Sequence, residues 1–384
     1  MSNRNRRTSR MDADRVRDQR AQDDRTVVFL GAGASRADGA PLQGELFRDY
    51  FRHYNNQAPG PANHAWDREL ATFFEVFFGI DVDDQDSIER ATFPTFEEVL
   101  GIIELADSQR ESFRDWGTSH TVDAQQKPRL QHMHDILTLL IAEILDHKLR
   151  GNAPHHPRLV RSLEGAGQLR NTSFVSLNYD ILIDNALLGL DEIDLDYAVE
   201  FMNAGRDWTK PRAARSIKLF KLHGSLNWLY CPTCRAMRIT PREKGVCRLK
   251  WRPGDCVCSR CQTLAVPIII PPTYFKALSN LYLRQIWHAA EQSLLECRRI
   301  VFCGYSFPDA DVHVRYLLKR VEVNGARTPD VFVVNEHAGK EPAAKRAEKD
   351  RYTRFFRDKA KVHWTELSFE RFCENPTAVE GVTT

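Results

Sequence analysis

The segment Thr26–Ser35, TVVFLGAGAS, constrains the fold more than any other part of the chain. Its first half is a run of β-branched, aromatic and aliphatic residues without polar alternation, which is typical of a parallel strand buried on both faces. A glycine-rich turn follows at once, because Gly31 and Gly33 lack the Cβ that would hinder a sharp bend or a close approach to a ligand. Strand, glycine turn and helix in this order predict an α/β fold whose turn can hold a pyrophosphate. The third glycine of the usual dinucleotide fingerprint is missing, so a glycine strand end without a ligand is the alternative.

Composition indicates a globular chain without a membrane or nucleic-acid signature. The 384 residues are 42% hydrophobic, which is enough to bury a sizeable core in one or two domains. A formal net charge of +2 does not support direct binding to nucleic acid or to an anionic membrane. No apolar run approaches the length of a membrane span, and the N-terminus has no hydrophobic signal core. We therefore expect a cytoplasmic protein.

The ends of the chain and a long middle segment differ from an α/β pattern. Residues 1–25 are rich in Arg and Asp and poor in large apolar residues, so we expect a disordered charged arm. From about 60 to 170 the apolar spacing is helical, which predicts a helical insertion in which Asp107–Pro128 is a mobile surface loop. The helices expected in this half are Leu42–Tyr54, Leu70–Phe78, Phe96–Leu105 and His132–Leu149. Residues 26–375 then form the folded domain, and 376–384 a polar tail.

Two adjacent histidines, His155 and His156, raise the hypothesis of a metal site. The sequence offers no third ligand at a plausible spacing. We interpret the pair as the start of a helix that continues over Pro157–Leu163, and we predict no metal there.

Four further predicted strands end in small or polar residues. They are Thr172–Leu177, Ile217–Leu222, Arg299–Cys303 and Val331–Val334. The carboxyl ends of parallel strands meet at one edge of a sheet, where open α/β folds bind their ligands. The residues that follow these strands are Asn178 with Asp180, His223, Gly304 with Tyr305 and Ser306, and Asn335 with Glu336. We expect His223 to be held in the open, where it titrates, while Asn178 and Asp180 also fit helix caps.

Six of the nine cysteines are crowded into one short segment, a distribution typical of a metal site rather than of disulfides. Two C-x-x-C pairs in it, Cys231 with Cys234 and Cys258 with Cys261, supply the four thiolates of a closed tetrahedral site. We predict a structural zinc ribbon over about 230–265, and a thioredoxin-like redox role is the alternative. Cys247 and Cys256 are spare thiols that fit alternative ligands, and Cys303 is expected to be a buried small hydrophobe.

In this order the motifs resemble those of the sirtuin family of NAD-consuming proteins, from about Thr26 to Glu336. Gly31, Ala32, Gly33, Ala34 and Ser35 look like the family's G-A-G-x-S loop, Asn178 with Asp180 like its T-Q-N-I-D segment, and His223 with Gly224 like its catalytic histidine-glycine pair. The cysteine pairs look like its zinc ribbon, Gly304, Tyr305 and Ser306 like its G-T-S, and Asn335 with Glu336 like its I-N-x-E. The resemblance implies a Rossmann-like parallel sheet that binds NAD as a substrate, with a helical insertion and a small zinc-ribbon module.

The chain departs from the protein deacylases of this family where they carry peptide-channel residues. Gly39–Glu45, GAPLQGE, replaces the family's G-I-P-D-F-R-S and lacks its aspartate and arginine. Pro271–Thr273 replaces its F-G-E, and Leu177 replaces the glutamine of T-Q-N-I-D. With its large helical insertion, the pattern is similar to the sirtuin-like effectors of bacterial antiphage defence, which hydrolyse NAD. The resemblance therefore implies an NAD glycohydrolase in that role.

The expected chemistry follows from nicotinamide being a good leaving group, whose departure develops positive charge at the anomeric carbon. We expect His223 to act as general base and Asn178 to hold the ribose or the attacking water. Asp180 orients the ribose or the attacking water, or stabilises the positive charge that develops on the ribose. The alternative is that Asp180 is only a helix cap. The glycine turn holds the phosphates, and the ends of the last two strands hold the ribose and adenine. An NAD-dependent protein deacylase or ADP-ribosyltransferase is the main alternative, and a non-catalytic nucleotide-sensing module is another.

The resemblance also implies that this protein assembles with other protein chains. Sirtuin-like chains of this size are often paired with a second gene product in defence systems, such as a hexameric DNA-translocating ATPase. We therefore expect a homo-oligomer and such a hetero-complex.

Overall fold

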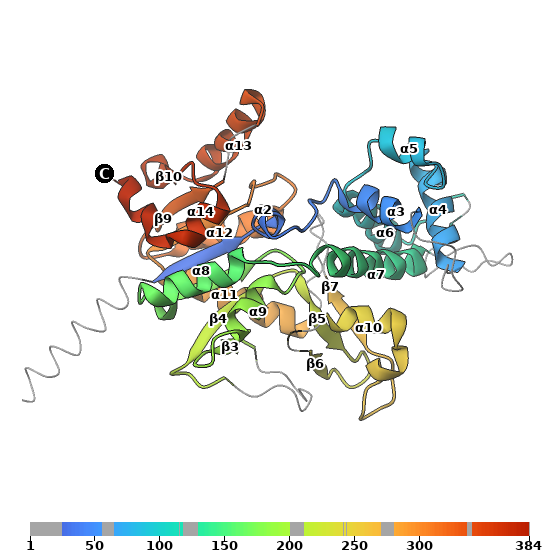
Figure 1. Ribbon diagram of the computed structural model, residues 1–384, viewed down its shortest axis with the longest axis horizontal. Helices are drawn as coiled ribbons and strands as arrows, with labels where there is room; N and C mark the ends of the chain where they lie inside the picture. The colour runs from blue at the N-terminus through green and yellow to red at the C-terminus, as the bar shows by residue number, and fades with distance from the viewer. Residues whose placement is uncertain are drawn as a thin grey trace, which may run out of the picture.

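The computed structural model describes residues 25–55, 65–114, 116–117, 130–199, 211–240, 242, 244–269, 280–335 and 340–383. Figure 1 shows a layered α/β body beside a second lobe of helices and a small sheet. Within the described ranges, no helix is long and apolar enough to cross a membrane. The predicted charged arm lies outside them except for Arg25, and so do residues 118–128 of the predicted surface loop and Pro271–Thr273.

A seven-stranded parallel sheet forms the centre of the body, as predicted. Its strands are β1 (Thr26–Leu30), β2 (Thr172–Ser176), β3 (Asp194–Asp196), β4 (Ser216–Lys221), β8 (Arg299–Cys303), β9 (Asp330–Val334) and β10 (Val362–Trp364), in the order β10-β9-β8-β1-β2-β4-β3. The chain order reverses at β1, where Leu30 is level with Ser176 of β2 and Cys303 of β8. The turns after these three strands therefore leave the sheet at one edge, at the switch point where open α/β sheets bind ligands.

Helices cover both faces of this sheet, because its strands are apolar on both sides. One layer contains α2 (Ala32–Ala37), α8 (His155–Gly165), α9 (Leu182–Leu188) and α14 (Phe369–Glu374), which contact one another. The other contains α11 (Leu281–Glu296), α12 (Val312–Asn324) and α13 (Pro342–Phe355). Cys303 is fully buried between the layers, as expected of a small hydrophobe.

The helical insertion comprises α3 (Leu46–Asn55), α4 (Ala65–Phe78), α5 (Gln85–Arg90), α6 (Phe96–Gln109) and α7 (Leu130–Lys148). These helices share an apolar core that is separate from that of the sheet, and they group to one side of it in Figure 1. The observed insertion thus begins earlier than the expected 60 and ends before 170. Its last expected helix, α8, belongs to the body instead, because Leu159, Val160 and Leu163 pack in the core of the sheet. Asp107, expected in a loop, lies in the last turn of α6.

The small sheet joins the insertion to form the second lobe. It consists of β5 (Gly224–Tyr230), β6 (Met237–Ile239) and β7 (Val266–Ile269), paired antiparallel in the order β6-β5-β7. The helix α10 (Gly245–Trp251) packs against both β5 and α7. Leu226, Leu229 and Val246 lie in the same apolar core as the insertion helices. The predicted ribbon segment is therefore packed against the insertion rather than standing alone.

Short 3-10 helices complete the chain at Leu169–Asn171, Pro253–Cys256, Lys359–Lys361 and Pro376–Thr383. The last of these corrects the expectation of a polar tail over 376–384. Val379 is only 4% exposed and packs in the core of the body, so an apolar anchor holds this segment in place.

His155 and His156 begin α8, as interpreted from the sequence, and the partner that holds them is Asp38 at the end of α2. The Asp38 carboxylate accepts hydrogen bonds from the backbone N–H groups of His155 and His156, at 2.9 and 3.1 Å. It also lies 2.5 Å from Nδ1 of His156, and both side chains are buried. Burial alone would raise the pKa of Asp38, but the hydrogen bonds from His156 and His155 outweigh it and hold this pKa below 3.8.

Replacing Asp38 with Asn is expected to lower the free energy of unfolding at neutral pH by about 1–3 kcal/mol, because charge-assisted hydrogen bonds are lost. A carboxyl whose pKa is lowered in the folded state stabilises the protein above its unfolded pKa and loses that contribution as pH falls through the folded pKa. Urea unfolding at about pH 6 and about pH 3 measures this. The unmodified chain should lose more stability on acidification than Asp38→Asn does, and equal losses would contradict the assignment.

Candidate functional site

The glycine turn after β1 packs against the end of β8. The N–H groups of Gly31 and Gly33 donate to the carbonyls of Cys303 and Gly304, at 2.9 and 2.8 Å. A Cβ added to Gly31 or Gly33 would lie 2.6 or 2.8 Å from the Gly304 backbone, so neither position has room for a side chain. These glycines therefore serve first to bring two strand ends together. The N–H of Ala34 also donates to a backbone carbonyl, and phosphate binding by this turn stays a prediction.

Replacing Gly304 with Ala is expected to lower the free energy of unfolding by about 2–4 kcal/mol. Gly304 has a φ of +61°, and a Cβ there would lie 2.1 Å from the backbone N of Ala34. Both the left-handed backbone and this contact resist a side chain. Gly44→Ala is the matched control, because a Cβ at Gly44 meets nothing within 4 Å. Urea unfolding measures both variants, and similar stabilities would refute the role given to the Gly304 contact.

Ser35, Asn178 and Asp180 form a hydrogen-bonded cluster that joins the turn after β1 to the turn after β2. Nδ2 of Asn178 donates to the carbonyl of Gly31 and to Oγ of Ser35, at 2.9 and 2.7 Å. Oγ of Ser35 donates to Asp180 at 2.6 Å, and Asp180 in turn accepts the N–H of Leu182 at the start of α9. Asp180 thus ties the turn after β1 to the first residue of α9, although the N-cap of that helix is Ile181, and its part in catalysis stays a prediction. Both amide hydrogens of Asn178 are used, which leaves Oδ1 as the atom able to accept from a hydroxyl or water.

His223 is buried, with 2% of its surface exposed, so the expectation of an open position was wrong. Its turn joins the two sheets, and the next residue, Gly224, pairs at once with Ile269 of β7. Nδ1 of His223 lies 3.1 Å from the carbonyl oxygen of Leu177, the residue before Asn178. A carbonyl only accepts hydrogen bonds, so Nδ1 carries the proton and Nε2 is the basic nitrogen of the neutral ring. The fold therefore brings His223 next to the segment that carries Asn178.

A buried ion pair behind this segment was missed by the sequence analysis. Lys221, the last residue of β4, donates to the backbone carbonyl of Asp180 and lies 3.4 Å from the carboxylate of Asp184. Asp184 also accepts the hydroxyl of Tyr197, which accepts from Nδ2 of Asn227 at 3.1 Å. The only signal in the sequence is a lysine at the end of an otherwise apolar strand. This network fixes the backbone of the turn after β2.

The residues that follow β8 and β9 mostly contact other parts of the protein. Tyr305 is 5% exposed, and its hydroxyl donates to Asp311 at 2.9 Å. Its carbonyl accepts from Nδ2 of Asn335 and from the hydroxyl of Tyr352, at 2.8 and 2.6 Å. The side chain of Tyr305 is therefore not available to a cofactor, although its backbone and Ser306 lie at the predicted edge. Oδ1 of Asn335 is buried without a hydrogen-bond partner among the described residues, and Glu336 lies outside them.

The four cysteines of the two C-x-x-C pairs converge as predicted. Their sulfur atoms all lie within 4.8 Å of one another, with 3.3 Å between Cys231 and Cys261 and 3.5 Å between Cys234 and Cys258. Four thiolates around a tetrahedral zinc ion with bonds of about 2.3 Å stand roughly 3.8 Å apart, so the donor set and its spacing fit zinc. Cys247 is not part of the cluster, because its sulfur faces the carbonyl of Ala142 in α7. Burial raises its pKa to about 12, which disfavours a thiolate ligand.

One family model matches the chain, over residues 172–356, and its description is the SIR2-like domain. This part of the chain is similar to the SIR2-like domain. The match runs from β2 to the end of α13 and therefore contains Asn178, His223, the four cysteines and Asn335. The glycine turn precedes it. No curated protein matches the sequence.

Solved structures of Sir2 proteins are similar to the whole chain at low identity. A Sir2 homologue in complex with NAD is 13% identical, with 95% of this chain and 92% of that one covered and a TM-score of 0.39. Sir2 with the inhibitor EX-527, 2′-O-acetyl-ADP-ribose and a deacetylated p53 peptide is 14% identical, with 93% and 94% covered and a TM-score of 0.38. A structure on the mechanism and regulation of Sir2 enzymes is 12% identical, with 94% and 93% covered and a TM-score of 0.42. At these scores the fold assignment rests on the strand order and the family model.

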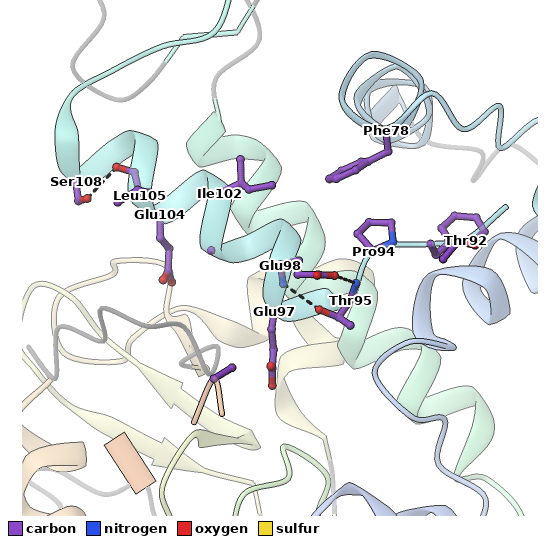
Figure 2. A pocket seen from close by; sticks show the side chains of 13 residues that line it. Phe78, Thr92, Pro94, Thr95, Glu97, Glu98, Ile102, Glu104, Leu105 and Ser108 are labelled. Atoms are coloured by element: carbon purple, nitrogen blue, oxygen red, sulfur yellow. Dashed lines mark hydrogen bonds between the residues drawn. The ribbon is translucent and has the colours of Figure 1, made fainter. Parts of the chain in front are cut away.

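A cavity of about 990 Å³ opens beside α6, between the helical insertion and the loop after β8. Its lining residues are Phe78, Thr92, Phe93, Pro94, Thr95, Glu97, Glu98, Gly101, Ile102, Glu104, Leu105, Ser108 and Ala310. Ala310 lies in the loop after β8, and the others come from the insertion. Figure 2 shows Glu97 and Glu104 extending from the same side of α6. The sequence analysis did not predict this cavity, because nothing local in the sequence indicates that the insertion lies beside the loop after β8.

Proposed function

We propose that this protein is an NAD glycohydrolase, which cleaves NAD to nicotinamide and ADP-ribose. The observation that supports the proposal is that His223 contacts Leu177, the residue before Asn178 of the Ser35–Asn178–Asp180 cluster, at the edge of the sheet where open α/β folds bind ligands. A largely buried polar cluster beside a buried histidine with a basic Nε2 suits the activation of water.

The proposed reaction breaks the bond between the nicotinamide nitrogen and the anomeric carbon of the ribose. The bonding electrons leave with nicotinamide, and the positive charge that develops on the ribose is quenched by water. His223 Nε2 takes a proton from this water, directly or through a ribose hydroxyl, and Oδ1 of Asn178 accepts a hydrogen bond from the same group. Zinc, held by the four cysteines, supplies structure to the ribbon and no step of this chemistry.

The test is chromatography of NAD after incubation with the purified full chain, with and without an acetyl-lysine peptide. Equal amounts of nicotinamide and ADP-ribose without peptide support the proposal. Turnover only with peptide, together with O-acetyl-ADP-ribose, favours the protein deacylase, and ADP-ribose attached to a protein favours the transferase. Intact NAD in every reaction of the isolated chain contradicts an enzyme that is active alone.

The biological role is proposed on the sirtuin resemblance. Depletion of NAD by such an enzyme arrests a cell, which suits an antiphage effector that acts on infection. A homo-oligomer and a complex with a hexameric DNA-translocating ATPase belong to the same proposal. Co-expression with a neighbouring ATPase gene, followed by size-exclusion chromatography, tests the complex.

A further inference from the structure

The turn between β2 and α9, residues 177–180, carries Asn178 and has no regular secondary structure. Its backbone is held by the segment that carries His223. Three of its four backbone carbonyls accept hydrogen bonds from residues 221–226. These carbonyls and their donors are Leu177 with Nδ1 of His223 at 3.1 Å, Tyr179 with the N–H of Leu226 at 2.9 Å, and Asp180 with Nζ of Lys221. The two segments that supply the proposed catalytic groups therefore fix each other's position.

Lys221 differs from the other two donors because it belongs to a buried ion pair. Its side chain is 0% exposed, and Nζ lies 3.4 Å from the carboxylate of Asp184, which is 1% exposed. Asp184 also accepts the hydroxyl of Tyr197. A buried ion pair is often no more stabilising than apolar residues of the same volume, because both charges lose their hydration. Stability alone therefore does not explain why β4 ends in a buried lysine.

The contact of Lys221 fixes the end of the turn that His223 does not hold. His223 binds the first carbonyl of the turn and Lys221 binds the last, and Asn178 lies between these two anchors. A hydrogen bond from an ammonium group to a carbonyl is stronger than one between neutral groups. Asp180 also accepts from Oγ of Ser35 at 2.6 Å, so the same residue links Lys221 to the cluster around Asn178. The position of Asn178 relative to His223 therefore depends on Lys221.

We propose that Lys221 is a positioning residue for NAD cleavage, which holds Asn178 beside His223 through the backbone of Asp180. This assignment rests on the proposed NAD glycohydrolase function. Lys221 is fully buried and its described partners are protein groups, so it acts through the turn and not on the substrate. A displacement of a catalytic group by about 1 Å costs roughly 10²-fold in rate. Loss of Lys221 is therefore expected to slow the reaction more than it weakens NAD binding.

Lys221→Met alone would leave the carboxylate of Asp184 buried without its cation, which destabilises a fold strongly. The test therefore uses the double variant Lys221→Met with Asp184→Asn. Met fills the space of the lysine stem, and Asn keeps an acceptor for the hydroxyl of Tyr197, so this variant should melt close to the unmodified chain. The kcat of nicotinamide release should fall about 10- to 100-fold, whereas KM for NAD should change less than about threefold. The pH at which kcat is half-maximal should not move, because His223 remains the base.

A second double variant, Lys221→Gln with Asp184→Asn, isolates the hydrogen bond to Asp180. Gln has the length of Met but ends in an N–H donor, so kcat should be at least about fivefold higher than in the Lys221→Met variant. Calorimetric titration with ADP-ribose gives the fraction of chains that bind, and kcat is expressed per binding chain. A loss of folded protein is in this way separated from a displaced turn.

Lys319→Met with Glu322→Gln is the matched control, because Lys319 also donates to a backbone carbonyl, that of Phe355, and pairs with a carboxylate. Its partners lie on α12 and α13, so kcat and KM should not change. The inference is overturned if both ion-pair variants lose the same rate, if the Lys221→Met variant keeps more than about a third of its kcat, or if Lys221→Gln recovers none of the loss. A kcat that stays constant while KM rises also overturns it. If the unmodified chain cleaves no NAD, the proposed function fails and this inference with it.

Discussion

Replacing His223 with Asn is expected to slow NAD cleavage by about 10²- to 10⁴-fold, the usual contribution of a general base. The amide of Asn can still donate to the carbonyl of Leu177, which His223 Nδ1 contacts at 3.1 Å, so the turn between the two sheets is preserved. What Asn lacks is the basic nitrogen that takes the proton from water. His223→Ala should lose as much activity and some stability, because it also leaves a hole in a buried site. Initial rates of nicotinamide release measure the effect.

A matched control tests whether the loss of rate depends on His223 itself or follows from replacing any histidine with Asn. His288 is an exposed residue on α11, and His288→Asn should retain the full rate. Melting temperatures of the three variants show which of them fold. A His223→Asn variant that melts like the unmodified chain and still cleaves NAD at more than about a tenth of its rate would exclude His223 as the base.

Several strands were predictable because their signals are local. Arg299–Cys303 was predicted to the residue, and Val331–Val334 to within one residue, since short apolar runs bounded by polar or glycine residues define buried parallel strands. The strand β5 was not predicted, because Ser225 and Asn227 interrupt its apolar pattern. Both are fully buried, and Asn227 reaches Tyr197, which is distant in the sequence. The helix α12 was also missed, since its apolar residues lie on its exposed side as well, as Tyr316 shows at 62% exposure.

The residues of the candidate site could be predicted from the sequence, but the contacts between them could not. Asn178, Asp180 and His223 were predicted because they follow the ends of strands. The parallel register of β1, β2 and β4 explains why all three lie at one edge of the sheet. The burial of His223 depends on a second sheet whose pairing with Gly224 no local pattern indicates. The contact of the glycine turn with Gly304 likewise joins segments far apart in the chain. Contacts of this kind decide which groups remain available to a ligand, so residue roles in the site stay predictions even where residue positions agree.

Removing one thiolate from the cysteine cluster is expected to have the largest effect on stability. Cys258→Ser breaks a four-sulfur site, and loss of a structural zinc ion should lower the stability of the second lobe by on the order of 5 kcal/mol. The lobe depends on the ribbon because β5 and α10 contribute Leu226, Leu229 and Val246 to its core. Metal analysis should give one zinc per unmodified chain and much less in the variant. Thermal unfolding should show an earlier transition.

The same change should also abolish NAD cleavage, although the cysteines lie away from the strand ends. The strand β5 starts directly after His223 and ends directly before Cys231, so the cysteine cluster and the proposed base lie at opposite ends of one strand. A ribbon that opens releases β5 and with it the turn that holds His223 against Leu177. Cys247→Ser is the matched control, since that thiol lies outside the cluster, and it should keep zinc and activity. Full activity in a Cys258→Ser variant without zinc would show that His223 is held by the large sheet alone.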